Sequence, residues 1–190
     1  MRMAPDEFAP LNTGRDQRPV RVKVWDPVVR IFHWCLVGMF TFSFLTGDEW
    51  KAAHVLSGYI ILGIISVRVL WGIVGSEHAR FANFIYAPHV VARFLFDTAR
   101  LRAKRYLGHN PAGGAMVIAL LSMVTCIGLT GYMMTTDVFW GMEWVEDVHK
   151  TLVYLTIALV CLHVVGVILA SLEHRENLVI SMITGWKRRN

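Results

Sequence analysis

The chain has 190 residues, of which 55% are hydrophobic and 17% charged, and its mean hydropathy is +0.46. Such a composition is too apolar for an ordinary soluble domain and indicates a small integral membrane protein. The three cysteines all lie in apolar runs and form no CxxC pair, so neither an iron–sulfur cluster nor a disulfide framework is supported. The formal net charge of +5 requires no nucleic acid, because membrane topology accounts for the basic residues.

The first 24 residues form an N-terminal arm without apolar periodicity, and we expect much of this arm to be poorly ordered. Hydrophobicity starts only after residue 27, whereas a cleavable signal peptide places its apolar stretch close to the start. We therefore expect the first apolar run to be an uncleaved spanning helix. Asp26 predicts its N-cap, with Pro27 at the first helical position.

Four apolar runs are long enough to span a membrane: 28–45, 52–75, 112–135 and 145–172. Each is near the roughly twenty residues that a spanning helix needs. The connections within the first pair of runs and within the second pair are short, so the helices of each pair are antiparallel neighbours. The sequence therefore predicts an all-α integral membrane fold, a four-helix bundle in one domain over residues 25–175, followed by a tail at 176–190.

The basic residues predict which side of the membrane each connection occupies. Segments 1–30, 76–111 and 175–190 carry six, six and four Lys or Arg residues, whereas the opposite side has only Lys51 and Lys150. Cytoplasmic segments carry this excess in membrane proteins. We therefore predict a multi-pass protein of the bacterial inner membrane with both termini and the 76–111 loop in the cytoplasm.

The 76–111 loop is the one long connection. Within 88–105, apolar residues such as Val91, Phe94 and Leu95 fall on one side and most basic residues fall elsewhere. This pattern favours an amphipathic helix that lies on the membrane surface near anionic lipid. The alternative is a basic, solvated loop.

Four of the eight histidines lie in or at the ends of spanning runs, where an ionisable side chain indicates function. His149 and His163 are fourteen residues apart, which on one helix is about four turns and a rise of about 21 Å on nearly the same face. Topology places His54 at the outer level with His149, and His33 at the inner level with His163. The predicted arrangement is two layers of two imidazoles.

Haem iron held by one neutral histidine on each face of the ring meets this requirement in an apolar bundle. Zinc is disfavoured, because neither layer has a Cys, Asp or Glu to complete a tetrahedron. We therefore predict two b-type haems between the helices, one held by His33 and His163 and the other by His54 and His149. The alternative is four unrelated interfacial or hydrogen-bonded histidines.

Small residues and one cation accompany the histidines. Glycines that would let a large ring approach the backbone lie near both ends of the third run and close to two of the histidines (Gly113, Gly114, Gly128, Gly131, Gly58 and Gly166). Plain helix packing also uses such residues. Arg68 lies fourteen residues after His54, at the level of the inner layer, where a buried cation would suit a haem propionate or a quinone oxygen. Its alternative role is to snorkel towards the helix end.

The chain carries five motifs, namely VWDPVVRIFHW at 24–34, AHVLSG at 53–58, GHNPAGGAM at 108–116, DVH at 147–149 and CLH at 161–163. Over about residues 22–175 they resemble the prokaryotic cytochrome b561 family, and more narrowly the b-type cytochrome subunits of Ni,Fe-hydrogenases. The resemblance implies a four-helix di-haem protein with His33, His54, His149 and His163 as axial ligands. It also implies electron exchange between a quinone pool and a redox partner, either hydrogenase-like or a periplasmic c-type cytochrome.

We therefore predict an electron-transfer cytochrome b, a subunit of an oxidoreductase system or itself a quinone oxidoreductase. Arg68 and His109 are candidates for a quinone site on the inner side. One alternative is a superoxide:quinone oxidoreductase that uses the same haems. A metal or proton transporter ranks last, because the spans lack Asp or Glu at depth.

Overall fold

The computed structural model describes residues 21–100 and 102–188. The predicted disorder of the N-terminal arm concerns residues that lie almost wholly outside this range. Within it, four helices are long and apolar enough to cross a membrane. They are α1 (Pro27–Thr46), α2 (Lys51–Val74), α4 (Pro111–Met133) and α5 (Glu143–Glu173), and they confirm the four predicted spans.

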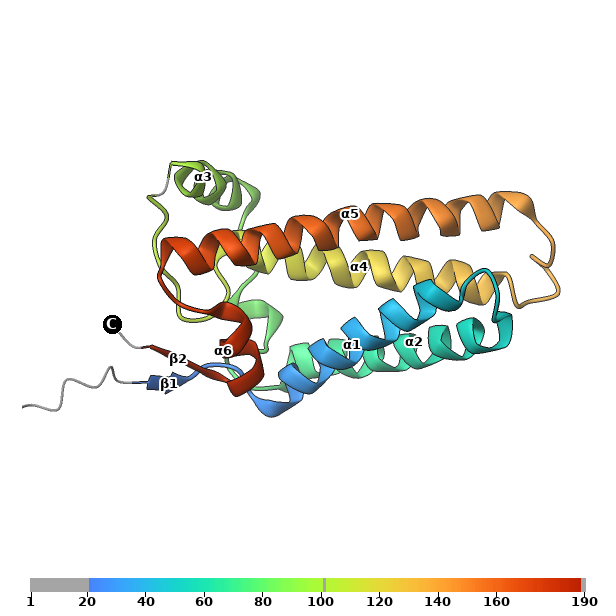
Figure 1. Ribbon diagram of the computed structural model, residues 1–190, viewed down its shortest axis with the longest axis horizontal. Helices are drawn as coiled ribbons and strands as arrows, with labels where there is room; N and C mark the ends of the chain where they lie inside the picture. Colours follow the sequence, from blue (N-terminus) through green and yellow to red (C-terminus); the bar gives the residue numbers. More distant parts are fainter. Residues whose placement is uncertain (1–20, 101, 189–190) are drawn as a thin grey trace, which may run out of the picture.

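The four long helices form two antiparallel hairpins (Figure 1). Helix α1 packs on α2, α4 packs on α5, and contact between α2 and α4 joins the two hairpins. Helices α1 and α5 have almost no close backbone contact in the described chain. The short connections lie at one end of the bundle, whereas the described ends of the chain lie together at the other end (Figure 1).

A side-chain cap determines where the first span begins. The Asp26 carboxylate accepts a hydrogen bond from Val29 N at 2.9 Å, and Pro27 occupies the first turn of α1, as predicted. The same carboxylate accepts hydrogen bonds from the Ser76 hydroxyl and from Trp71 Nε1, which ties the start of α1 to the end of α2. Both contacts lie at the end of the bundle that holds the chain termini.

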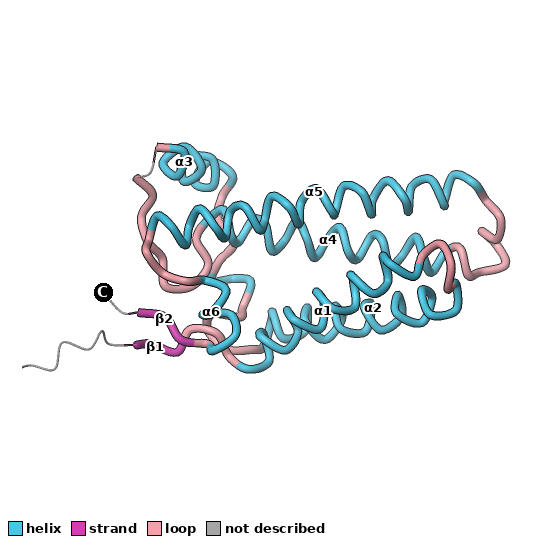
Figure 2. The backbone as a smooth tube through the Cα atoms, in the orientation of Figure 1, coloured by secondary structure: helices cyan, strands magenta, loops and turns pink. Residues whose placement is uncertain are grey.

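Helix α3 (Pro88–Ala99) confirms the helical part of the predicted surface segment but ends earlier than expected. The Asp97 carbonyl accepts hydrogen bonds from Arg100 N at 3.2 Å and Arg102 N at 2.9 Å, which closes a turn where the helix was expected to continue. Helix α3 runs across the bundle rather than along it (Figure 2). Its Leu95 and Phe96 side chains are exposed.

Several short elements at the same end are absent from the sequence-based expectation. Strand β1 (Arg21–Lys23) pairs antiparallel with β2 (Trp186–Arg188), so the two ends of the described chain meet (Figure 2). Helix α6 (Leu178–Thr184) precedes β2, and a 3-10 turn, η1 (Phe81–Asn83), follows α2. Gly185, with a φ of 88°, ends α6, and its carbonyl accepts from Val24 N and Trp25 N. We call β1, β2 and α6 the terminal cap.

Candidate haem-binding histidines

The structure brings His54 and His149 together at the end of the bundle opposite the terminal cap. Their ring centroids are 6.1 Å apart, and the ring planes are 80° apart. His54 lies in the first turn of α2 and His149 in the second turn of α5, so one imidazole comes from each hairpin. This is the pairing that topology predicts for the outer level.

The hydrogen bond of His54 fixes which ring nitrogen carries its proton. His54 Nδ1 lies 2.8 Å from the Ser43 carbonyl oxygen. A carbonyl oxygen can only accept, so Nδ1 carries the hydrogen and Nε2 keeps its lone pair. The Ser43 hydroxyl lies farther away, at 3.2 Å. His54 is therefore oriented as a metal ligand through Nε2.

His149 is held in the same tautomer by a hydroxyl group. The Thr130 hydroxyl hydrogen is directed to backbone carbonyls of its own helix, Cys126 O at 2.9 Å and Ile127 O at 3.0 Å. Its oxygen is then free to accept from His149 Nδ1, which lies 3.0 Å away. Because Nδ1 donates, Nε2 of His149 also retains its lone pair.

The spacing of these two rings fits a single metal between them. A metal–imidazole bond is about 2 Å long and the ring centre lies about 1 Å beyond the nitrogen, so two opposed imidazoles on one metal have centroids about 6 Å apart. The observed separation is 6.1 Å. In the part of the chain that the structure describes, no group of three or more His, Cys, Asp or Glu side chains gathers. The pair therefore lacks the further protein ligands of a tetrahedral zinc site.

The glycines singled out from the sequence differ in what surrounds them. A Cβ on Gly131 would lie 3.3 Å from His149 Cε1, so this glycine lets the imidazole approach α4. Gly114 and Gly128 instead pack closely against Phe84 and Leu62, as in plain helix packing. A Cβ on Gly58, one turn beyond the α2 histidine, would meet nothing within 4 Å.

The inner histidines are arranged more loosely. His33 on α1 and His163 on α5 are half-buried. No hydrogen bond or ring contact joins them in the described chain. His33 Nδ1 is buried and has no hydrogen-bond partner among the described residues. The two residues lie on the two helices that have almost no close backbone contact in the described chain, and their pairing stays a prediction.

Arg68 is buried rather than extended to the surface. It is 6% exposed, its Nη2 donates to the Ala79 carbonyl at 3.3 Å, and its guanidinium lies over the Phe81 ring at 4.9 Å. Its Nη1 is buried without a partner among the described residues. An unpaired buried guanidinium nitrogen is costly, and an anionic or carbonyl oxygen would remove that cost.

His109 precedes α4 and lies in an aromatic environment. Its ring is 4.7 Å from the Trp25 ring and 4.5 Å from the Phe84 ring, centroid to centroid. Burial, and then the charge of Arg68, lower the pKa of His109 to about 3, so the ring is neutral at physiological pH. A cavity of about 180 Å³ adjoins it, lined by polar and aromatic residues (Glu77, His78, Asn83, Phe84, Tyr86, Tyr106, Gly108 and His109).

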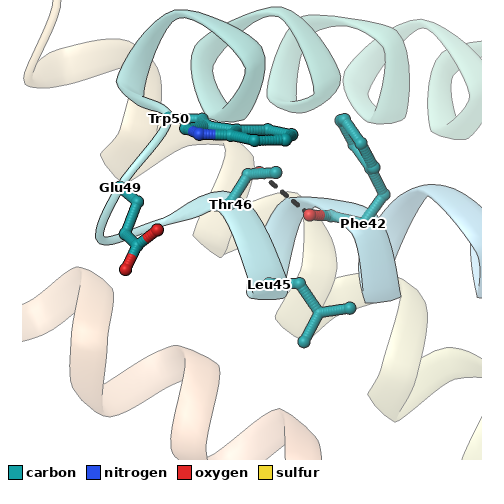
Figure 3. A pocket seen from close by; sticks show the side chains of 5 residues that line it. All are labelled: Phe42, Leu45, Thr46, Glu49 and Trp50. Atoms are coloured by element: carbon teal, nitrogen blue, oxygen red, sulfur yellow. Dashed lines mark hydrogen bonds between the residues drawn. The ribbon is translucent and has the colours of Figure 1, made fainter.

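A second hollow lies beside the turn between α1 and α2 and has a volume of about 270 Å³. Figure 3 shows its lining, in which the Thr46 hydroxyl donates to the Phe42 carbonyl at 2.9 Å and the Trp50 ring lies over one side. Glu49 places a carboxylate at this hollow. None of the five lining residues (Phe42, Leu45, Thr46, Glu49 and Trp50) is among the site residues predicted from the sequence.

Sequence reasoning also missed Ser43 and Thr130, which orient the outer histidines. For Ser43 a signal was present in the hairpin geometry, because Ser43 and His54 are equidistant from the middle of the α1–α2 connection and such positions lie at the same height in an antiparallel hairpin. Thr130 and His149 are not symmetric about the α4–α5 connection, so their contact has no such signal in the sequence.

Known proteins match this chain along most of its length. The family described as prokaryotic cytochrome b561 matches residues 24–185. A probable Ni/Fe-hydrogenase B-type cytochrome subunit of Azotobacter vinelandii is 24% identical, covering 93% of this chain and 94% of that protein. A protein of the same description from Rhodobacter capsulatus is 21% identical, covering 89% of this chain and 82% of its own length. No solved structure matches significantly.

The curated relatives are longer than this chain. The alignment with the Azotobacter vinelandii protein extends over 231 positions, more than the 190 residues present here. That relative therefore carries inserted residues that have no counterpart in this chain. The histidines and the four apolar helices lie within the matched part.

Proposed function

Because the chain belongs to the prokaryotic cytochrome b561 family, we propose that it is a di-haem b cytochrome that transfers electrons across the bacterial inner membrane. Its electrons pass between a quinone pool and a redox protein. The four axial ligands in this proposal are His33 and His163 at the inner level, and His54 and His149 at the outer level.

The observation that carries the proposal is the arrangement of the outer histidines. Both use Nδ1 as a hydrogen-bond donor, both retain a lone pair on Nε2, and their rings are 6.1 Å apart. Two unrelated interfacial histidines have no reason to share a tautomer at this ring spacing. A metal held between the two nitrogens accounts for both features.

When bound, haem supplies a one-electron carrier at each level, and the protein tunes its potential through ligation, burial and nearby charge. The residues of this chain have defined parts in that arrangement. The Ser43 carbonyl and the Thr130 hydroxyl hold the outer imidazoles in the ligating tautomer. The two ligands on α5 are fourteen residues apart, about 21 Å along the helix, which separates the two levels by most of the bilayer.

We place the quinone site in the cavity beside His109. Its Tyr86 and Tyr106 rings are 6.3 Å apart in an edge-to-face arrangement, and the neutral His109 ring offers a hydrogen bond to a quinone oxygen. In this proposal His109 Nδ1, buried without a partner among the described residues, supplies that bond. The residues that line the cavity belong to the segments between α2 and α3 and between α3 and α4, on the predicted cytoplasmic side.

The redox partner docks at the opposite end in this proposal. Trp50 and Trp140 are exposed there, and the Lys51 ammonium lies over the Trp140 ring at 5.2 Å, which links the two connections. Aromatic residues at a membrane interface show the same exposure. The proposed partner is a hydrogenase-like protein, in keeping with the names of the relatives, or else a c-type cytochrome.

The alternative function, a superoxide:quinone oxidoreductase, gains no support from the hollow beside the turn between α1 and α2. Superoxide is an anion, and the hollow between α1 and α2 carries the Glu49 carboxylate (Figure 3). A fixed negative charge at the entrance raises the free energy of an approaching anion. The transporter alternative also lacks an acidic ion site, since no cluster of three or more His, Cys, Asp or Glu occurs in residues 21–100 and 102–188.

A short-chain quinol added to the purified protein tests the proposal. We expect the wild type to show rapid reduction of its haem absorbance. His163→Ala should lose the inner haem and slow reduction of the outer haem, whereas His54→Ala should leave reduction of the inner haem fast. If the outer haem of His163→Ala and the inner haem of His54→Ala are reduced at equal rates, a quinone site on the inner side is contradicted. Absence of haem in the wild type would contradict the function itself.

A further inference from the structure

Helix α3 has one face packed on the protein and one open face. Phe94 is buried, its ring lies 5.8 Å from the Tyr106 ring, centroid to centroid, and Val91 on the same side is half-buried. Leu95 and Phe96 are instead 54% and 55% exposed. The structure therefore divides the apolar side predicted from the sequence, because Val91 and Phe94 pack on the protein while Leu95 does not.

The open face of α3 has an apolar half and a basic half. At about 100° per residue, four exposed apolar residues share an arc of about 100° (Ala92, Leu95, Phe96 and Ala99). The exposed Arg93 and Arg100 lie just beyond one edge of this arc. Where the two halves meet, the Arg100 guanidinium lies over the Phe96 ring at 3.8 Å. Apolar surface and positive charge are thus adjacent but separate on this face.

Basic residues outnumber acidic ones in and directly after α3. Residues 88–105 contain five Lys or Arg residues and one acidic residue, Asp97, which is half-buried on the side that faces the protein. Arg105 is already paired with Glu176 at 2.9 Å. The other four basic residues are exposed, and within residues 21–100 and 102–188 they form no ion pair (Arg93, Arg100, Arg102 and Lys104). The open face therefore carries positive charge that no described carboxylate pairs with.

Helix α3 lies at the level where the spanning helices end. It has 12 residues, a length of about 18 Å, which is too short to cross a hydrocarbon core of about 30 Å. It runs across the bundle and packs on α4 (Figure 2). The segment after it is fastened to the end of α5, because Ala103 N donates to the carboxylate of Glu173, the last residue of α5, at 3.0 Å. A helix in this position lies along a membrane surface rather than through the membrane.

Adjacent apolar and basic residues suit the boundary between acyl chains and anionic headgroups. We propose that the open face of α3 binds anionic phospholipids of the leaflet at this end of the spans. Leu95 and Phe96 enter the acyl region, and Arg93 and Arg100 bind headgroup phosphates. A zwitterionic headgroup offers no net charge to the two arginines, and a free phosphate would leave the apolar half in water. The inference requires a membrane-spanning chain but neither haem nor quinone.

Hydrogen–deuterium exchange of the full chain in lipid nanodiscs tests the proposal. The exchange of the α3 amides is compared in phosphatidylcholine alone and in phosphatidylcholine mixed with phosphatidylglycerol. One basic residue near an anionic surface changes a binding equilibrium roughly fivefold, so two arginines should slow exchange in α3 on the order of tenfold when phosphatidylglycerol is present. High salt should remove this difference, because it screens exposed charges.

Two double variants separate the charge of α3 from the charge of the whole protein. Arg93→Gln with Arg100→Gln should abolish the difference between the two lipid mixtures. Arg21→Gln with Lys23→Gln is the matched control, because it removes two charges from exposed positions of β1, and it should keep the difference. Leu95→Gln tests the apolar half: glutamine also favours a helix, so faster exchange of α3 in both mixtures would report lost contact with acyl chains.

Equal exchange of α3 in the two lipid mixtures would overturn the proposal, even if no variant folds. Inorganic phosphate that protects α3 equally in phosphatidylcholine nanodiscs would also overturn it, because a free anion would then suffice. Loss of the difference in the β1 double variant would overturn it as well, since net charge alone would then explain the effect. Exchange in Leu95→Gln at the wild-type rate would overturn the apolar contact. Because haem is not measured, failure here leaves the proposed function unchanged.

Discussion

Replacement of Thr130 by valine tests the role of the outer histidine pair with little change of shape. The substitution removes the oxygen that accepts from His149 Nδ1 at 3.0 Å, while the histidine remains almost buried, at 9% exposure. A neutral hydrogen bond contributes about 1 kcal/mol, and a buried donor left without an acceptor costs about 1–3 kcal/mol. We therefore expect haem at the outer level to bind roughly 10- to 100-fold more weakly, the range known for lost outer-shell partners of metal-bound histidines.

The assay is the rate at which haem transfers from the purified protein to an excess of apomyoglobin, followed in the Soret band. Thr125→Val is the control, because among the described residues the Thr125 hydroxyl bonds only to Leu121 O, at 2.7 Å. Thr130→Val should release one of two haems faster than the wild type does, whereas Thr125→Val should behave as the wild type. If the two variants release haem at the same rate, the hydrogen bond does not orient a ligand.

Three further predictions concern single features of the structure. Ser43→Ala should leave both haems bound and their potentials unchanged in a redox titration, because the backbone carbonyl and not the hydroxyl is the 2.8 Å acceptor. Gly131→Leu should lose the outer haem in a haem assay, because even its Cβ would lie 3.3 Å from His149, whereas Gly63→Leu, with open space around it, should keep both haems. The pKa of Glu176 is lowered although burial alone would raise it, since hydrogen bonds from Arg188 N and Arg105 outweigh the burial. The terminal cap should therefore keep this stabilisation above the ordinary glutamate pKa and lose it as the pH falls through the pKa of the folded protein. The loss should appear as reduced protection of the β1 amides from hydrogen exchange, relative to an unfolded chain at the same pH, and Glu176→Gln should no longer show this pH dependence. Protection of the β1 amides that does not change with pH in the wild type would refute this assignment.

The sequence predicted the spanning helices well because hydropathy is a strong local signal. The predicted run 28–45 became Pro27–Thr46, and 52–75 became Lys51–Val74. The capping residue Asp26 was predictable for the same reason, since an N-cap depends only on its own helix. The levels of the histidines followed from helix direction, and the structure brings His54 and His149 together as that reasoning expects.

The remaining features depend on contacts between distant segments. Strands of three residues have no readable periodicity, and only the pairing of β1 with β2 turns Lys187 inward. The early end of α3 depends on the Asp97 carbonyl, which closes a turn that the apolar pattern does not show. The burial of Arg68 against Phe81 likewise depends on how the segment after α2 folds back.

Haem stoichiometry tests the account most directly. The pyridine haemochrome of the purified protein, read with a reduced-minus-oxidised spectrum, should give two b-type haems per chain. His54→Ala should retain one of them and His163→Ala the other, with different midpoint potentials. One haem in the wild type would contradict the two-level arrangement, and a bound transition metal without haem would contradict the assignment as a cytochrome.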